Sequence, residues 1–136
     1  MSASKEIETG LAFTPKFDAN GLITVIAQDA DTSAVLMVAY MNDEALAETI
    51  RTGRGVYYSR SRKKLWRKGE ESGHVQQVRE ILLDCDQDCL ILKIHVDDGQ
   101  CHVGYQSCFY RRVKPASSQL EFVAQPVYDP NEAYKK

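Results

Sequence analysis

The sequence predicts a mainly β fold: a β-rich α+β domain in which a barrel-like twisted sheet carries one capping helix. Apolar, β-branched runs of strand length recur along the chain, turn residues separate them, and only one segment carries signals for both ends of a helix. A chain of 136 residues with 43% hydrophobic content has room for one ordinary core. We therefore expect a single domain, 1–136, with its core at about 17–113 and a peripheral tail at 114–136.

The expected strands follow one another with few interruptions. The first two runs flank a turn rich in Asp, Thr and Ser and predict a hairpin. A basic loop that extends to Gly73 follows the third run, and an Asp-Gly pair after the fifth predicts another tight turn. We expect the last run to be a core strand. The ranges are 22–28, 34–41, 55–61, 75–83, 90–96, 101–105 and 108–113.

Residues 42–53 are expected to form the one helix. Asn42 is the expected N-cap, and the two acidic residues that follow it stand where the helix dipole favours negative charge. Gly53 follows the last apolar position and is expected to end the helix. The narrow apolar face consists of Ala45, Leu46, Thr49 and Ile50.

Composition narrows the class of protein. The net charge of -2 and the hydrophobic content exclude a disordered chain. The longest apolar run, 34–41, is far shorter than the ~20 residues that cross a bilayer, and no apolar signal segment follows Met1. We expect a cytoplasmic protein with no membrane partner. Its four cysteines are then buried, metal-bound or catalytic, because cytosolic chains rarely keep disulfides.

The basic residues are unevenly distributed. Eight of the 17 lie in 51–68, a stretch without any acidic residue. Such a block is typical of a site for anionic groups, and equally of a solvated face.

Three aspartates alternate with other residues at Asp84, Asp86 and Asp88. If this segment is extended, their side chains share one face and repel one another unless a hard cation binds them. An EF-hand is excluded, because its sixth position would be Cys89 instead of glycine and its twelfth His95 instead of glutamate. The pattern favours Mg²⁺ with several waters, and the alternative is a merely acidic turn.

Thiolates favour a softer metal, and zinc is the usual one. In an extended segment Cys85 and Cys89 would be about 13 Å apart, too far to share one ion unless the segment bends. Cys85, Cys101 and Cys108 then remain, which suits a catalytic zinc with three protein ligands and an open position. His102 is a candidate fourth ligand or general base. The alternative is that the cysteines are simply core residues.

Three ordered motifs carry a resemblance. They are Ser59–His74 (SRSRKKLWRKGEESGH), Asp84–Asp88 (DCDQD), and Cys101-His102 with Ser107–Phe109. In these residues the sequence resembles the phosphoribosyl-AMP cyclohydrolases of histidine biosynthesis, over about 17–113. One residue departs from the family pattern: Glu71 stands where a small or hydroxyl residue is expected.

The resemblance implies the monofunctional form of a hydrolase that opens the adenine ring of phosphoribosyl-AMP between N1 and C6. It implies an intertwined homodimer with one zinc per subunit, held by Cys85 of one chain and by Cys101 and Cys108 of the other, and magnesium at the three aspartates. Zinc lowers the pKa of bound water toward 7, which supplies hydroxide for attack on C6. His102 is the candidate catalytic residue that shuttles a proton to the leaving N1.

The substrate carries two phosphates, which the basic block suits. Trp66 is expected to stack on the purine or a ribose, or to be a core residue. Glycines 69 and 73 let backbone N–H groups approach a phosphate. The candidate substrate-binding residues are Arg60, Arg62, Lys64, Trp66, Lys68, Gly69, Glu70, Ser72 and His74.

Two alternatives belong to other classes. One is a non-catalytic zinc module that binds nucleic acid through 51–68, against which stand the acidic isoelectric point and the aspartates. We expect no nucleic-acid partner. The other is a different zinc hydrolase acting on a phosphorylated nucleotide. Zincin proteases, base deaminases, P-loop enzymes and dinucleotide-binding folds are disfavoured, because their motifs are absent from the sequence.

Overall fold

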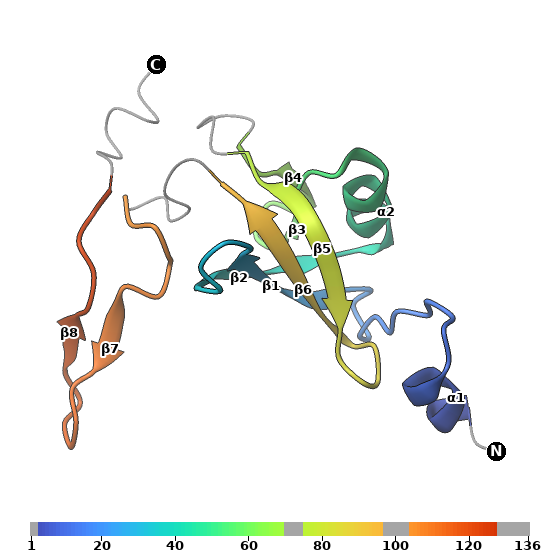
Figure 1. The fold of residues 1–136 in the computed structure, drawn as a ribbon, viewed down its shortest axis with the longest axis horizontal. Coiled ribbons are helices and arrows are strands. Elements are labelled where there is room, and N and C mark those ends of the chain that lie inside the picture. Colours follow the sequence, from blue (N-terminus) through green and yellow to red (C-terminus); the bar gives the residue numbers. More distant parts are fainter. Residues whose placement is uncertain (1–2, 70–74, 97–103, 128–136) are drawn as a thin grey trace.

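The computed structural model describes residues 3–69, 75–96 and 104–127, and these are built around a four-stranded sheet in the order β2-β1-β6-β5 (Figure 1). β1 pairs antiparallel with β2 and parallel with β6, and β5 pairs antiparallel with β6. The hairpins β3–β4 and β7–β8 each form a separate two-stranded sheet. The elements are α1 (Ala3–Thr9), β1 (Ile23–Asp29), β2 (Val35–Met41), α2 (Asp43–Thr52), β3 (Val56–Ser59), β4 (Lys64–Arg67), β5 (Gln77–Leu83), β6 (Cys89–His95), β7 (Arg111–Val113) and β8 (Leu120–Phe122). The expected strand-rich fold class with few helices is confirmed.

The core lies on one face of the central sheet. Buried and half-buried residues alternate along β1 and β6, as period-two side chains on a pleated strand require. Val25, Leu90, Leu92 and Ile94 have no exposed surface. The residues on the other face of β1 and β6 are half-buried.

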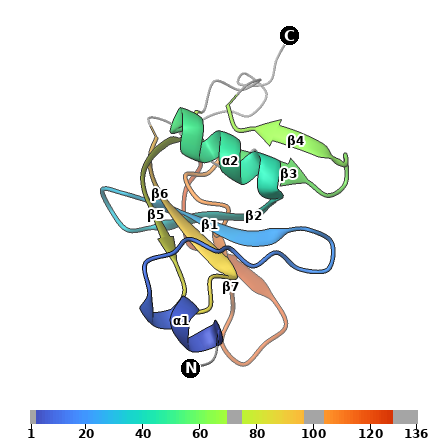
Figure 2. The same cartoon turned by 90° about the vertical axis from the view of Figure 1, so that its right-hand side faces the viewer.

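Helix α2 has the predicted boundaries. The Asn42 side chain accepts a hydrogen bond from the Ala45 amide (2.8 Å), and Gly53 ends the helix at a φ of 72°. The expected apolar face is wrong at one position, because Ile50 is 52% exposed. The helix packs mainly against β2 and β3, and its buried residues are Ala45, Leu46 and Thr49, so the buried stripe is narrower than the sequence pattern suggests. Figure 2 shows α2 beside the β3–β4 hairpin.

Four elements differ from the prediction, one of which is β8, a strand within the expected peripheral tail. Part of the expected basic loop is strand β4. Its backbone pairs antiparallel with β3, and this pairing keeps the segment extended although half of its residues are basic. The expected core strand at 108–113 is reduced to β7, which is exposed throughout and pairs with β8 at one side of the central sheet (Figure 1). Helix α1 is a second helix that the sequence did not predict, because its seven polar-rich residues carry no amphipathic pattern. None of the helices in the described ranges is long and apolar enough to cross a membrane.

Candidate metal and substrate site

The aspartate segment is a tight turn that joins β5 to β6, so the condition of an extended segment is not met and the segment bends. The Asp84 amide donates to the Cys89 carbonyl and the Gln87 amide to the Asp84 carbonyl, both at 3.1 Å. Gln87 adopts a φ of 60°, in the left-handed region. The antiparallel ladder ends at the pair Leu83–Leu90, and the chain has to reverse between these two residues.

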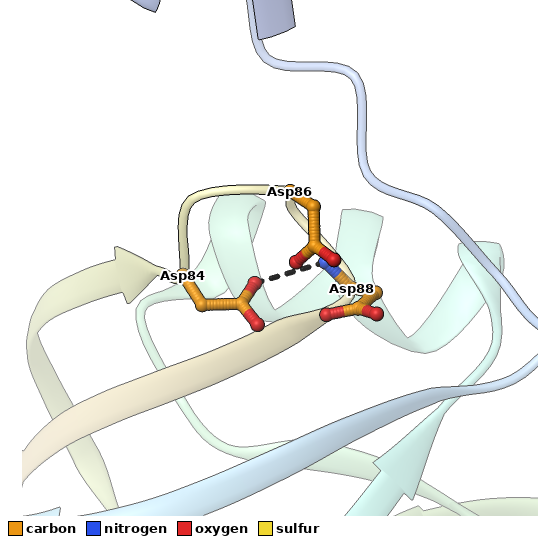
Figure 3. A group of neighbouring side chains, drawn as sticks. All are labelled: Asp84, Asp86 and Asp88. Atoms are coloured by element: carbon orange, nitrogen blue, oxygen red, sulfur yellow. Dashed lines mark hydrogen bonds between the residues drawn. The ribbon is translucent and has the colours of Figure 1, made fainter. Parts of the chain in front are cut away.

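The turn nevertheless gathers the three carboxylates. One oxygen each of Asp84, Asp86 and Asp88 lies within 4.8 Å of the other two (Figure 3). Asp84 Oδ1 accepts hydrogen bonds from the amides of Asp88 (3.0 Å) and Cys89 (3.1 Å). Asp86 Oδ1 is buried and has no hydrogen-bond partner among the described residues. Leaving such an oxygen unpaired costs about 1–3 kcal/mol, which a bound cation would offset.

The pKa values of Asp84 and Asp88 are shifted in opposite directions. Hydrogen bonds with Asp84 and Asp86, burial and the charges of both neighbours raise the pKa of Asp88 to about 6. Burial raises the pKa of Asp84, but the hydrogen bonds from Asp88 and Cys89 outweigh burial and lower the pKa of Asp84 below its ordinary value. Three oxygen donors of this kind suit a small hard cation such as Mg²⁺.

The predicted zinc ligands that the structure describes lie apart in one chain. Cys85 is an exposed free thiol in the aspartate turn. Cys108 is also exposed, and its amide donates to the Leu36 carbonyl (2.7 Å) of edge strand β2. Cys101 and the predicted proton shuttle His102 lie outside the described residues.

The strand register measures this separation. Leu36 precedes Met37, which pairs with Ala27, and Ala27 pairs with Leu92, three residues after Cys89. With a rise of ~3.3 Å per residue over four residues and ~4.8 Å for each of two strand spacings, about 16 Å of sheet separates Leu36 from Cys89. Sulfurs that bind one zinc lie only ~4 Å apart. Cys85 and Cys108 are therefore anchored at different ends of the sheet.

Cys89, which is not among the predicted zinc ligands, begins strand β6. Burial and the three nearby carboxylates raise the pKa of its thiol. The Cys89 side chain is therefore a neutral thiol near pH 7, a poorer metal ligand than a thiolate.

The basic residues line the β3–β4 hairpin. Arg60 and Arg62 lie in its turn and Lys64 begins β4, all three exposed. The Arg60 guanidinium lies 4.1 Å from the centre of the Tyr40 ring. Tyr40 received no role from the sequence, because nothing in the local pattern indicates which ring a distant arginine will contact.

The strand register places this contact near the aspartate turn. Tyr40 pairs with Thr24, which pairs with Cys89 at the end of the turn, and all three are half-buried on the same face of the sheet. Two strand spacings, ~10 Å, separate Tyr40 from Cys89. Arg60 therefore lies at the same end of the central sheet as the three carboxylates.

The second half of the hairpin is more enclosed. Trp66 is 39% exposed, and its ring centre lies 5.6 Å from that of Tyr57, its partner on β3. Lys68 is buried, with its Nζ 5.7 Å from the Trp66 ring. A cavity of about 220 Å³ opens beside it, lined in part by Arg54 and Arg67. Gly69 is half-buried with a φ of 91°, and Glu70, Ser72 and His74 lie outside the described residues.

The sequence of the chain is similar to those of known proteins. Residues 37–110 match the family model described as phosphoribosyl-AMP cyclohydrolase. A protein named phosphoribosyl-AMP cyclohydrolase from Nitrobacter winogradskyi is 54% identical, over 99% of this chain and 98% of its own length. Proteins of the same name from Bordetella parapertussis (60%, over 88% and 91%) and Bradyrhizobium diazoefficiens (53%, over the whole of both chains) are similarly close. The range that the family model matches contains the basic hairpin, the aspartate turn and all four cysteines.

Proposed function

The chain belongs to the phosphoribosyl-AMP cyclohydrolase family and is a hydrolase of histidine biosynthesis, and we propose that it uses zinc to hydrolyse the N1–C6 bond of the adenine ring of phosphoribosyl-AMP. One observation carries the proposal. Within the range that the family model matches, three converging carboxylates and the cationic Arg60 lie at the same end of the central sheet. That pairing suits a phosphorylated substrate bound beside metal ions.

The donor chemistry fits both metals. Cys85, Cys101 and Cys108 offer the thiolates that zinc prefers, and when bound there zinc supplies a water molecule that ionises near neutral pH. The orphaned Asp86 oxygen and its two neighbours fit Mg²⁺. Magnesium at this position would also fix the turn that carries Cys85.

Other side chains bind the substrate. Arg60, Arg62, Lys64 and Lys68 bind the two phosphates, and the Trp66 ring stacks on the nucleotide. Gly69, Glu70, Ser72 and His74 complete the substrate-binding set, as the family motif implies.

His102 moves the proton. Addition of hydroxide to C6 and cleavage of the C6–N1 bond leave the bond electrons on N1. The His102 imidazolium donates a proton to N1, and the resulting imidazole accepts the hydroxyl proton as the C6 carbonyl forms. The exocyclic nitrogen stays on C6, so the product is a carboxamide.

A homodimer is part of the proposal. Because Cys85 and Cys108 of one chain are anchored at different ends of the central sheet, two copies together can supply what one cannot. The β7–β8 region presents the surface for it: two-stranded hairpins are marginal alone, and this one exposes several large apolar side chains. They are Phe109, Val113, Leu120, Phe122 and Val123. We place the enzyme in the cytoplasm, where the Cys85 thiol would stay reduced.

The ultraviolet spectrum tests the reaction directly. Zinc-loaded protein mixed with phosphoribosyl-AMP is expected to change the purine absorption as the ring opens, whereas Cys85→Ser protein is expected to leave it unchanged. A folded, zinc-loaded protein that leaves the spectrum unchanged would contradict the proposed reaction.

A further inference from the structure

Gln87 stands at the centre of the aspartate turn and binds a distant part of the chain. Its side chain is almost fully buried. The Thr14 amide donates to Gln87 Oε1 (2.8 Å), while Gln87 Nε2 donates to the carbonyls of Ala12 (3.1 Å) and Ile7 (3.4 Å). The Lys16 amide donates to the Gln87 carbonyl (2.7 Å). One residue therefore joins the turn to the segment 7–16, which passes beside it in Figure 3.

The backbone of Gln87 shows that these contacts determine its conformation. Non-glycine residues rarely adopt a φ of 60°, and they keep it only where the surroundings over-determine it. Here a buried amide that uses both its oxygen and its nitrogen, together with the backbone bond from Lys16, supplies that constraint. The segment 7–16 thus acts as a strap across the turn.

We propose that Gln87 is a positioning residue for the magnesium site, because it clamps the turn to the strap and so fixes the direction of its two neighbours. Asp86 and Asp88 flank Gln87, so any rotation of its peptide units moves both carboxylates relative to Asp84. Mg²⁺ demands nearly ideal octahedral geometry and tolerates such movement poorly. The inference rests on the proposed function, specifically on the aspartates being the metal ligands.

The test compares two glutamines on full-length, zinc-loaded protein. Gln87→Asn keeps the amide and tolerates a positive φ, but it is one methylene too short to reach the strap. Gln28→Asn is the matched control, because Gln28 Nε2 also donates to a backbone carbonyl (Ser33, 2.8 Å), in the turn between β1 and β2. Calorimetric titration with MgCl₂ is expected to show binding about tenfold weaker for Gln87→Asn, as is usual for residues that orient metal ligands. Gln28→Asn is expected to bind like the wild type.

A second variant leaves the aspartate turn unchanged. Thr14→Pro removes the amide that donates to Gln87 Oε1, and Pro15 already restricts residue 14 to extended conformations that proline accepts. Mg²⁺ binding is expected to weaken several-fold. In both strap variants the Lys16 amide is expected to exchange its hydrogen faster than in the wild type, which reports release of the strap independently of activity.

The outcomes separate the inference from its premise. Undiminished Mg²⁺ affinity in a variant whose Lys16 amide exchanges faster would overturn the positioning role. If Gln87→Asn does not fold, Thr14→Pro decides in the same way. Wild-type protein that opens the purine ring but binds no Mg²⁺ would overturn the magnesium site and this inference with it, while leaving the proposed reaction intact.

Discussion

At the scale of single residues, Gly55 organises the base of the basic hairpin. Its amide donates to the Gln76 carbonyl and its carbonyl accepts from the Lys68 amide, both at 3.1 Å. A Cβ at this position would overlap the Gln76 side-chain oxygen. That oxygen accepts the Tyr57 hydroxyl, and Gln76 Nε2 contacts Met37 Sδ at 3.3 Å, all in the buried interior. Glycine is required here for space, not for a positive φ.

Gly55→Ala is therefore expected to destabilise the protein by about 1–3 kcal/mol, because the new methyl group displaces a buried amide from its hydrogen bonds. Urea unfolding measures the loss. The clash needs the Gln76 side chain, so the same substitution in a Gln76→Ala background should cost clearly less. Equal costs in the two backgrounds would show that the Gln76 amide is not what excludes a side chain at 55.

At the scale of elements, one ion pair ties helix α2 to strand β4. Arg67 donates from Nε to Glu48 Oε2 (2.6 Å) and from Nη2 to Glu48 Oε1 (2.9 Å), a two-pronged contact of fixed geometry. The hydrogen bond from Arg67 and its charge outweigh partial burial and lower the pKa of Glu48. Because α2 also rests on the central sheet, this pair fixes the hairpin that presents the basic residues.

The Glu48–Arg67 pair gives a pH-dependent prediction. A carboxyl whose pKa is lower in the folded chain stabilises it above the ordinary value of 4.5, and this contribution disappears as pH falls through the folded-state pKa. Glu48→Gln is therefore expected to melt at a lower temperature than the wild type at pH 7, with a difference that closes as the pH falls below the ordinary value of 4.5 and through the lowered pKa of Glu48.

Thermal melts at several pH values measure that difference. Glu44→Gln, on the first turn of α2, serves as the control for a changed charge on the same helix. A wild-type advantage that persists unchanged to pH 3 would mean that Glu48 stabilises the fold by contacts other than its charge.

At the scale of the whole molecule, the sheet holds its two described zinc candidates at opposite ends. If two copies share each zinc, Cys85→Ser and Cys101→Ser proteins are inactive alone, yet their mixed dimer has one intact site. After subunit exchange the mixture is expected to regain about a quarter of the wild-type activity, since half the dimers are mixed and each has one of two sites. Steady-state assays before and after exchange measure the recovery.

The matched control mixes Cys101→Ser with Cys108→Ser. Both residues come from the same side of the proposed site, so no intact site forms and no recovery is expected. Recovery in this control, or its absence from the first mixture after exchange is verified, would contradict the shared site.

The sequence predicted what local chemistry determines. Asn42 and Gly53 mark the ends of α2 in the sequence, because a helix cap acts within one turn. The three aspartates are predicted to form one site because their alternate spacing is visible in the sequence. It missed what distant contacts decide. The segment 84–88 turns because β5 pairs with β6, and Gln87 meets residues more than 70 positions away. No local pattern encodes either.

The parallel pairing of β1 with β6 joins two segments that are far apart in the sequence. Thr24 pairs with Cys89, so about 65 further residues have to be synthesised after Thr24 before strand β6 can pair with β1. During synthesis the β1–β2 hairpin and α2 can form early, but β1 then presents an unpaired edge of apolar strand. Closing such a distant contact is slow compared with forming a hairpin. We therefore expect the nascent chain to be most prone to aggregate just before β6 leaves the ribosome. Once β6 pairs with β1, it completes the core and covers the exposed edge of β1.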